Sequence, residues 1–471
     1  MAITGKDLID MGFPPGPEFG RALRHINAEG LTGDALVAYV AFAKPAPIEV
    51  QPLLAEPAPF HRNIEAETED EVANVDAVMR SMDRLMHTPT LVEGAVMPDA
   101  CPAGPEGTIP VGGVAVARNA IHPGMHSADI CCSVMLTEFD DADPAAVMDA
   151  VHAATHFGPG GRPSGARSYT LPAALRDEMA SNPFLANEKA MLMAETHLGT
   201  QGDGNHFAYV GRSEATGKVC LVTHHGSRGL GAVLYKLGMT RAEEHRRDHA
   251  PDVLRQNAWI PADTDEGEAY WAALQLVRAW TKLNHTVIHD ATVAAAGDAR
   301  DRFWNEHNFV FRKGDLFYHA KGATPVDDSF LPDTDGRQIV PLNMGAPIQI
   351  VRGDTRGSNL GFAPHGAGRN LSRTAHIRRQ EGRTEAEIFA EETAGLDVRF
   401  YTGNVDVSEL PSAYKPAATV AAQMRQFDLA DVVDQITPYG SIMAGDWERD
   451  APWKKKRAAK KAAQARRAGN G

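Results

Sequence analysis

Short β-rich runs separated by glycine-rich turns occupy the chain from about residue 90 to residue 445. Five of them read VGGVAVA (111–117), SVMLTEF (133–139), KVCLVTHH (218–225), QIVPLNM (338–344) and IQIVRG (348–353). Such runs, bounded by turn residues, are typical of strands. One stretch, about 267–297, instead has Tyr270, Leu274, Val277 and Trp280 at helical spacing. The mixture predicts an α+β body.

Residues 1–85 differ from this body and suggest a small helical module with a linker. Short amphipathic helices, interrupted at Pro14-Pro15-Gly16, are indicated by the spacing of Leu8, Ile9, Phe19, Leu23, Ile26 and Leu31. Residues 44–60 are rich in Pro and Ala, and residues 64–87 are acidic and helical in pattern. We therefore expect a module at 1–85, a main domain at 86–450 and a basic tail at 451–471.

The charge of the 471-residue chain is unevenly distributed. Its formal net charge is -14, yet residues 454–467 (KKKRAAKKAAQARR) carry eight basic residues and no acidic one, which leaves -22 on the remainder. An acidic body does not bind a polyanion non-specifically, so any RNA site must be a local basic pocket or this tail. The tail fits RNA contact and a solvated extension equally.

Location and redox state follow from what the sequence lacks. No apolar run is long enough to span a bilayer, and the first residues (MAITG) lack the basic and apolar regions of a signal peptide. Four cysteines in so long a chain do not form a disulfide framework. We expect a cytoplasmic protein whose thiols are buried apolar groups or thiolate ligands.

Four segments place a metal-capable side chain near glycine or in a short loop: HSADICCS (126–133), GDGNHF (202–207), VTHHGSRGLG (222–231) and NEHNFV (305–310). Taken singly, each side chain has an ordinary explanation as a turn cap, a core thiol or an interior histidine. Together they favour a metal site that combines imidazole, thiolate and carboxylate. The candidates are Asp129, Cys132, His206, His224 and His307.

A fifth segment, HGAGRNLSR (365–373), joins His365 to a Gly-Ala-Gly loop and two arginines. Glycines let backbone N–H groups approach an anion, and arginine neutralises phosphate. A histidine there could attack an activated phosphate, although a tight turn capped by histidine explains the segment equally well. By contrast, His285 and His289 (HTVIH) lack the glutamate of the metalloprotease helix, so we interpret them as helix surface or packing.

These segments, in this order, resemble the RtcB family of RNA ligases over roughly residues 90–440. The likeness rests on DICC, GNHF, HHGSRGLG, HNFV, KGAT (321–324), NMGA (343–346) and HGAGRNLSR. It implies a mixed β-sheet body with surrounding helices, and it makes residues 86–450 the catalytic domain. The stretch 3–23 separately resembles a helical segment of tRNA nucleotidyltransferases, which hints at RNA, whereas a helical hairpin packed on the body explains it as well.

The resemblance implies a reaction and its cofactors. A histidine attacks the α-phosphate of GTP with manganese present, and a histidine–GMP intermediate forms. A 2′,3′-cyclic phosphate end is opened to a 3′-phosphate, receives GMP, and is then sealed to a 5′-hydroxyl end. RNA with those ends is the implied substrate, and an archease-like protein is a possible accessory.

Carried over by motif, His365 is the nucleophile. One Mn²⁺ would bind Asp129, Cys132 and His206, and a second would bind Cys132, His224 and His307. The implied nucleotide contacts are Asn205, His206, His307, Asn308, Asn343, Met344, His365, Gly366, Ala367, Gly368 and Tyr414.

The chain departs from the family mainly where the base would bind. PDACPAGPEG (98–107) has Cys101 where the family has a histidine, and no lysine. Tyr209 replaces a glutamate that reads guanine, Leu342-Asn343 replaces Gly-Ser, and Ile348 replaces a serine. SIMAGDW (441–447) lacks the family's final lysine. We therefore expect a divergent paralogue with retained phosphoryl chemistry and relaxed or altered nucleotide choice.

Two other functions remain open from the sequence. The chain could be a metal-dependent phosphoesterase that processes RNA ends without joining them, since metal-bound water can hydrolyse a phosphate without a histidine nucleophile. It could also be a non-catalytic RNA-binding paralogue that uses the N-terminal module and the tail.

Overall fold

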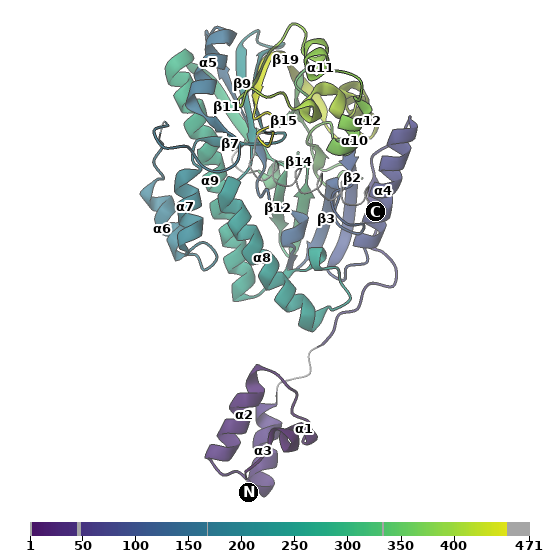
Figure 1. Ribbon diagram of the computed structural model, residues 1–471. Coiled ribbons are helices and arrows are strands. Elements are labelled where there is room, and N and C mark those ends of the chain that lie inside the picture. Colours follow the sequence, from purple (N-terminus) through teal and green to yellow (C-terminus); the bar gives the residue numbers. More distant parts are fainter. Residues whose placement is uncertain (1, 45–48, 167, 332–333, 450–471) are drawn as a thin grey trace, which may run out of the picture. The chain divides into compact units, whose positions relative to one another are not determined.

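The computed structural model describes residues 2–44, 49–166, 168–331 and 334–449, and the chain divides into two compact units (Figure 1). The first unit is Met1–Gln51 and the second is Pro52–Gly471. The sequence suggested the first boundary at residue 85. Its three-part division stays a prediction, and the basic tail at 451–471 lies outside the described residues.

The first unit is a three-helix module with its own core. Its helices are α1 (Gly5–Asp10), α2 (Pro17–Ala28) and α3 (Gly33–Ala43). Thr4 caps α1 in a capping box with Asp7, and proline is the first residue of α2. The expected interruption at Pro14-Pro15-Gly16 lies between these two helices. The buried core is formed by Leu8, Phe13, Ala22, Ile26, Leu36 and Val40.

The second unit contains two large sheets. The larger has the order β11-β5-β9-β8-β19-β16-β15, with β18 beside β19. Its strands are β5 (Ser133–Phe139), β8 (Phe207–Ser213), β9 (Val219–His225), β11 (Ala299–Glu306), β15 (Gln338–Val340), β16 (Ile348–Arg352), β18 (Asp397–Phe400) and β19 (Asp431–Met443). All neighbours are antiparallel except β18 and β19.

The smaller sheet has the order β1-β2-β3-β13-β12. Its strands are β1 (Phe60–Arg62), β2 (Leu91–Cys101), β3 (Val111–Arg118), β12 (Asn308–Lys313) and β13 (Leu316–Lys321). Three short pairs complete the strands: β4 (Ala120–Ile121) with β10 (Ile260–Pro261), β6 (His156–Phe157) with β7 (Thr200–Gly202), and β14 (Ala323–Pro325) with β17 (Phe362–Pro364). The larger sheet passes into the smaller one at His307, the single residue between β11 and β12.

Helices surround both sheets (Figure 1). They are α4 (Glu69–Leu85), α5 (Pro144–Ala154), α6 (Ala173–Ser181), α7 (Glu188–Thr196), α8 (Arg228–His249), α9 (Asp265–Ala296), α10 (Arg373–Arg379), α11 (Glu385–Glu392) and α12 (Ala417–Gln426). The expected α+β class and the long helix at 267–297 are confirmed. Among the described residues, no helix is long and apolar enough to cross a membrane.

The two faces of the larger sheet have different partners, because side chains alternate along a strand. One face carries Ala208, Val210 and Leu221, which pack under α5 through Val147 and Val151. The other face carries a second apolar cluster that includes Val134, Leu136, Tyr209, Val222, Ile348 and Ile436. Cys132 and His224 continue this second face at the strand ends, since Val134 is paired with His224.

Candidate functional site

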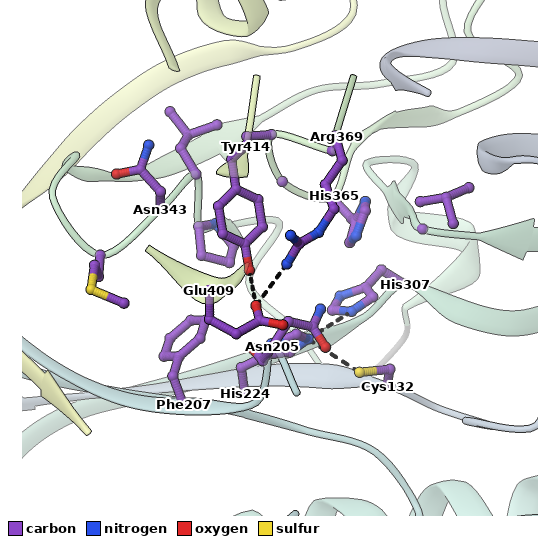
Figure 2. Close-up of a pocket in the computed structure, with 18 of the residues that line it drawn as sticks. Cys132, Asn205, Phe207, His224, His307, Asn343, His365, Arg369, Glu409 and Tyr414 are labelled. Atoms are coloured by element: carbon purple, nitrogen blue, oxygen red, sulfur yellow. Dashed lines mark hydrogen bonds and ion pairs between the residues drawn. The ribbon is translucent and has the colours of Figure 1, made fainter. Parts of the chain in front are cut away.

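A cavity of about 480 Å³ lies over that second face, where the two sheets meet. Its wall contains most residues singled out in the sequence: Asp129, Cys132, Asn205, His224, His307, Asn308, Asn343, Met344, His365, Gly366, Ala367, Gly368 and Tyr414. His206 lines an adjoining cavity of about 680 Å³ that shares Asp129 and Asn205. Figure 2 shows Cys132 and His307 at one end and Asn343 toward the other.

A tight turn before β5 presents Asp129 and Cys132. Ser127 (φ 73°) and Cys131 (φ 56°) adopt left-handed conformations, which bend the backbone sharply. The Cys131 N–H donates to Asn308 O (2.7 Å), and the His307 N–H donates to Cys132 O (2.9 Å). These bonds fix the turn to the junction of β11 and β12, and so bring residues far apart in sequence together.

Glycine next to the candidate ligands has a steric reason. A Cβ at Gly226 would lie 2.0 Å from Asp129 Oδ1, and one at Gly202 would lie 2.7 Å from His206 Nδ1. Both distances are far below van der Waals contact, so neither position accepts a side chain without displacing a candidate ligand. Gly202 and Gly226 therefore allow the candidate ligands to lie close together.

Two groups of potential ligands share Cys132: Asp129, Cys132 and His206, and Cys132, His224 and His307. Cys132 Sγ lies 3.6 Å from His206 Nε2 and 3.1 Å from His224 Nε2. His224 Nε2 lies 3.1 Å from His307 Nε2, and His206 Nε2 lies 3.1 Å from Asp129 Oδ2. The structure thus brings all five candidates together, in the two sets that the resemblance implied.

The electrostatics of these groups suit a cation. Burial lowers the pKa of His224 to about 3 and the pKa of His307 well below its usual value, so both imidazoles are neutral at pH 7. His224 Nδ1 donates to Asn205 O (3.1 Å), which leaves Nε2 with a lone pair. Burial would raise the pKa of Asp129, but its charge interaction and hydrogen bond with His206 lower it to about 2.

Cys132 is the group that a cation would change most. Burial raises the pKa of its thiol well above the usual value, and the Asp129 carboxylate raises it further. A metal ion reverses this balance, because a coordinated thiol loses its proton. Three imidazoles, one carboxylate and one shared thiolate form a mixed hard and soft set that fits a pair of divalent transition-metal ions.

His365 follows β17 and faces the same ligands. Its ring centroid lies 4.9 Å from that of His307. Its Nδ1 lies 2.6 Å from Asp99 Oδ2, which also accepts the His365 backbone N–H at 3.1 Å. The Gly366–Gly368 loop packs closely on β2, since a Cβ at Gly368 would lie 1.8 Å from Asp99 O.

Sequence reasoning missed two acidic residues at this site. Asp99 lies within β2 and is fully buried. Glu409 is also buried and accepts hydrogen bonds from Arg369 (2.7 Å) and from the Tyr414 hydroxyl (Figure 2). It also accepts two hydrogen bonds from Arg373 (2.7 and 2.9 Å). A lone carboxylate in the otherwise apolar run GAVMPDAC was a signal for Asp99. Glu409 had none, because its partners become visible only in the fold.

The two arginines after His365 are engaged by protein groups. Arg369 also donates to Ser408 O and lies over the Tyr414 ring, 4.3 Å from its centroid. The sequence suggested that both arginines neutralise phosphate. In the structure, their first partner is the Glu409 carboxylate, so they hold the cavity wall in place as well as adding positive charge.

The HTVIH pair takes no part in the ligand groups. His285 stacks on His225 with ring centroids 3.5 Å apart, and both His285 and His289 hydrogen-bond Thr223 Oγ1. They belong to α9 and contact the face of the larger sheet opposite to the cavity, through Thr223 of β9. This agrees with the packing interpretation, whereas the surface interpretation is wrong because both side chains are fully buried.

Comparison with known proteins gives one family. A family model described as "tRNA-splicing ligase RtcB" matches residues 175–444. The chain is similar to the tRNA-splicing ligase RtcB of Pyrococcus abyssi (27% identity over 305 residues, 55% of this chain and 33% of that protein). It is also similar to that of Thermococcus kodakarensis (26% over 303 residues; 55% and 62%) and to the RNA-splicing ligase RtcB of Mycobacterium tuberculosis (27% over 292 residues; 54% and 67%).

The matched part of the chain spans about a third to two thirds of the length of these relatives. Asp129 and Cys132 lie before the segment that the family model matches, and the fold places them in one cavity with His224, His307 and His365, which lie inside that segment.

Proposed function

The chain belongs to the RtcB family, and on that premise we propose that it joins RNA ends. It seals a 2′,3′-cyclic phosphate or 3′-phosphate end to a 5′-hydroxyl end, with Mn²⁺ and GTP. The observation that carries the proposal is the pair of three-residue ligand groups that share Cys132. All of their residues except His206 line the cavity that also holds His365. A histidine beside two cation sites is suited to phosphoryl transfer.

Two manganese ions would be held by these groups, one by Asp129, Cys132 and His206, the other by Cys132, His224 and His307. When bound, such ions neutralise phosphate charge and polarise phosphoryl oxygens. The chain's own contribution is to keep both sites next to His365, with Cys132 buried between them.

His365 is the proposed nucleophile. Its Nδ1–H donates to Asp99 Oδ2, so the lone pair is on Nε2. Nε2 bonds to the α-phosphorus of GTP while the bond to pyrophosphate breaks, and pyrophosphate leaves with the electron pair. GMP then passes from His365 to the RNA 3′-phosphate. The RNA 5′-hydroxyl displaces GMP and closes the strand.

The remaining cavity residues bind the nucleotide. Asn205, His206, His307, Asn308 and the Gly366-Ala367-Gly368 loop would lie along the phosphates. Asn308 Oδ1 accepts the Gly322 N–H (2.7 Å), which leaves its Nδ2 to donate. Asn343, Met344 and Tyr414 would contact the nucleoside. We further propose a cytoplasmic location and an archease-like accessory protein, both from family membership.

The test is covalent labelling of the full chain. Protein with Mn²⁺ is incubated with α-phosphate-labelled GTP or ATP, and the label should be acid-labile and alkali-stable, as a phosphoramidate is. The His365→Ala variant should lose the label, and His152→Ala, which removes an exposed histidine, should keep it. An RNA with a 2′,3′-cyclic phosphate and a 5′-hydroxyl should be sealed only by the labelled protein.

Other results would point to the alternatives. The protein is an end-processing phosphoesterase if it hydrolyses the cyclic phosphate, is labelled by neither nucleotide, and keeps its hydrolytic activity in the His365→Ala variant. If it takes up no Mn²⁺ and labels with no nucleotide, it is a non-catalytic paralogue.

A further inference from the structure

The cavity floor away from the ligand groups is built by two neighbouring strands. In the β8–β19 pair, Phe207 lies opposite Met443 and Tyr209 lies opposite Ser441. All four side chains face the cavity. Ile348 of β16 extends the floor, and the loop Pro341–Met344 forms the wall opposite, with Asn343 at its far end (Figure 2). The result is an apolar slot of the kind that takes a flat ring.

Few polar groups at this slot are free to recognise a ligand. The Tyr209 hydroxyl donates to Ile436 O (2.7 Å) and is fully used as a donor. Ser441 is 1% exposed, and its Oγ has no hydrogen-bond partner among the described residues. Asn343 Oδ1 accepts the Gly345 N–H (2.9 Å), which leaves the amide nitrogen. A hydroxyl and an amide are therefore the groups that face a bound ring.

No free carboxylate reaches the slot from the described lining residues, of which only Asp129 and Glu409 are acidic. Asp129 lies in a ligand group. Glu409 Oε1 accepts two hydrogen bonds from Arg373, and Oε2 accepts one from Arg369 and one from Tyr414. Its oxygens are thus engaged by three protein side chains.

This polarity discriminates between purines. Guanine presents two adjacent donors, N1–H and the 2-amino group, and these lose binding free energy when they are buried without acceptors. Adenine presents an acceptor at N1 and one amino group, and a single hydroxyl satisfies either, since it both donates and accepts. The free Ser441 hydroxyl on an apolar floor therefore suits adenine better.

We propose that the slot takes a purine base without selecting guanine, and that ATP donates its nucleotide to His365 at least as well as GTP. The transfer step in this proposal rests on the proposed function, whereas the predicted preference in nucleotide binding does not depend on it.

Two measurements on the full chain test it. The first compares initial rates of labelling with α-labelled ATP and GTP at equal concentration with Mn²⁺. The second compares the Kd values of ATP and GTP by equilibrium dialysis on His365→Ala, which binds without transfer. We expect the ATP rate and affinity to equal or exceed those for GTP. A GTP preference of about tenfold or more in binding overturns the proposal.

The two measurements separate the inference from the proposed function. Absence of labelling by either nucleotide contradicts the transfer chemistry, and the Kd ratio still decides the base preference. Labelling by GTP alone, with tighter GTP binding, supports the ligase chemistry and overturns the proposal that the slot does not select guanine.

Single substitutions test which side chain sets the preference between ATP and GTP. Ser441→Ala should weaken ATP binding by about fivefold, the typical value for one neutral hydrogen bond. Ser441→Asp supplies the missing acceptor and should shift the Kd ratio toward GTP. Thr437→Ala, an exposed hydroxyl on the same strand that lines no part of this cavity, is the matched control and should change neither Kd. Should the aspartate variant not fold, unchanged ATP binding in Ser441→Ala would still rule out the hydroxyl's role.

Discussion

The smallest unit that bears on the proposed transfer is the pair Asp99–His365. One carboxylate oxygen, Asp99 Oδ2, accepts both the ring Nδ1–H and the backbone N–H of His365. Two bonds to one residue fix the orientation of the ring and its tautomer, since they place the proton on Nδ1. Asp99 touches no reacting atom in this arrangement, so it is a positioning residue.

Replacing Asp99 by Asn should slow nucleotide transfer to His365 roughly 10–100-fold, the usual cost of losing such an orienting partner. The amide keeps the size of the side chain but can present its NH₂ group to Nδ1, which favours the wrong tautomer. The measurement is the single-turnover rate of labelling. Nucleotide Kd and manganese content should stay at wild-type values, whereas a merely structural role would change both.

Asp76→Asn, an exposed carboxylate on α4, provides the control for that rate. A wild-type labelling rate in Asp99→Asn would remove the positioning role.

At the level of residues, the sequence singled out side chains that the structure brings together mainly where chemistry and glycine occur side by side. His206, His224 and His365 stand close in sequence to glycines that leave no room for a side chain, so the pattern itself marks them. Asp99 and Glu409 have no such mark. Asp99 meets His365 across 266 positions, and Glu409 meets Arg369 across 40. Contacts at that separation are fixed by the tertiary fold, which no local pattern encodes.

At the scale of elements, α9 shows that two histidines four residues apart on a helix can be packing residues as well as metal ligands. His285 and His289 are four residues apart, as two ligands on one helix face would be. In the fold that face meets β5 and β9. His289 Nδ1 and Nε2 lie 2.8 Å from Thr137 Oγ1 and Thr223 Oγ1. Both ring nitrogens are thus used by threonine hydroxyls, and the helix is fixed to the sheet.

Replacing His289 by Ala should therefore lower the free energy of unfolding by about 2–3 kcal/mol, because it opens a cavity and removes two buried hydrogen bonds. Urea denaturation measures this change. Manganese content per chain, determined by elemental analysis, should not fall.

His224→Ala is the informative comparison, since it removes a residue of the second ligand group and should reduce manganese content. Loss of metal from His289→Ala at unchanged stability would reverse the assignment of the two histidines.

Strand register explains why the ligand groups could be suspected but not assembled from sequence. The runs KVCLVTHH and SVMLTEF are recognisable as strands, and both form as predicted, in β9 and β5. That Val134 lies opposite His224, which brings Cys132 beside that histidine, depends on the pairing β5–β9. A shift of one residue would turn His224 to the α9 face. Register is set by packing on both faces and not by either run alone.

For the whole molecule, the site depends on how the two sheets are joined. The smaller sheet supplies Asp99, the larger supplies the floor, and His307 is the hinge residue between β11 and β12. The sequence predicted an α+β body and a long helix, because composition and periodicity are local. It did not predict two sheets, because their orders pair segments far apart in the chain, as when Phe207 of β8 lies opposite Met443 of β19.

The same burial that keeps His224 and His307 neutral affects global stability, and His122 isolates the effect away from the site. His122 is fully buried against Trp259 and His319, with Nδ1 donating to Asn257 O and Nε2 accepting from Thr90. Burial lowers its pKa from 6.5 to about 3, and burial also lowers the pKa of His319 well below its usual value. Both rings therefore stay neutral in the folded chain at moderately acidic pH.

The sign of the pH effect follows from proton uptake. Below pH 6.5 the unfolded chain protonates His122 and the folded chain does not, so stability is complete above that pH and falls as the pH is lowered toward 3. From pH 7 to pH 5, His122 alone should lower the free energy of unfolding by about 2 kcal/mol.

The measurement is urea denaturation at both pH values, with EDTA to remove metal. Between these pH values, the free energy of unfolding of a His122→Gln variant should fall less than that of the wild type, by the same amount. His152→Gln, at an exposed position, should keep the wild-type loss. Equal losses in wild type and His122→Gln would mean that this buried histidine takes up its proton in the folded chain as easily as in the unfolded one.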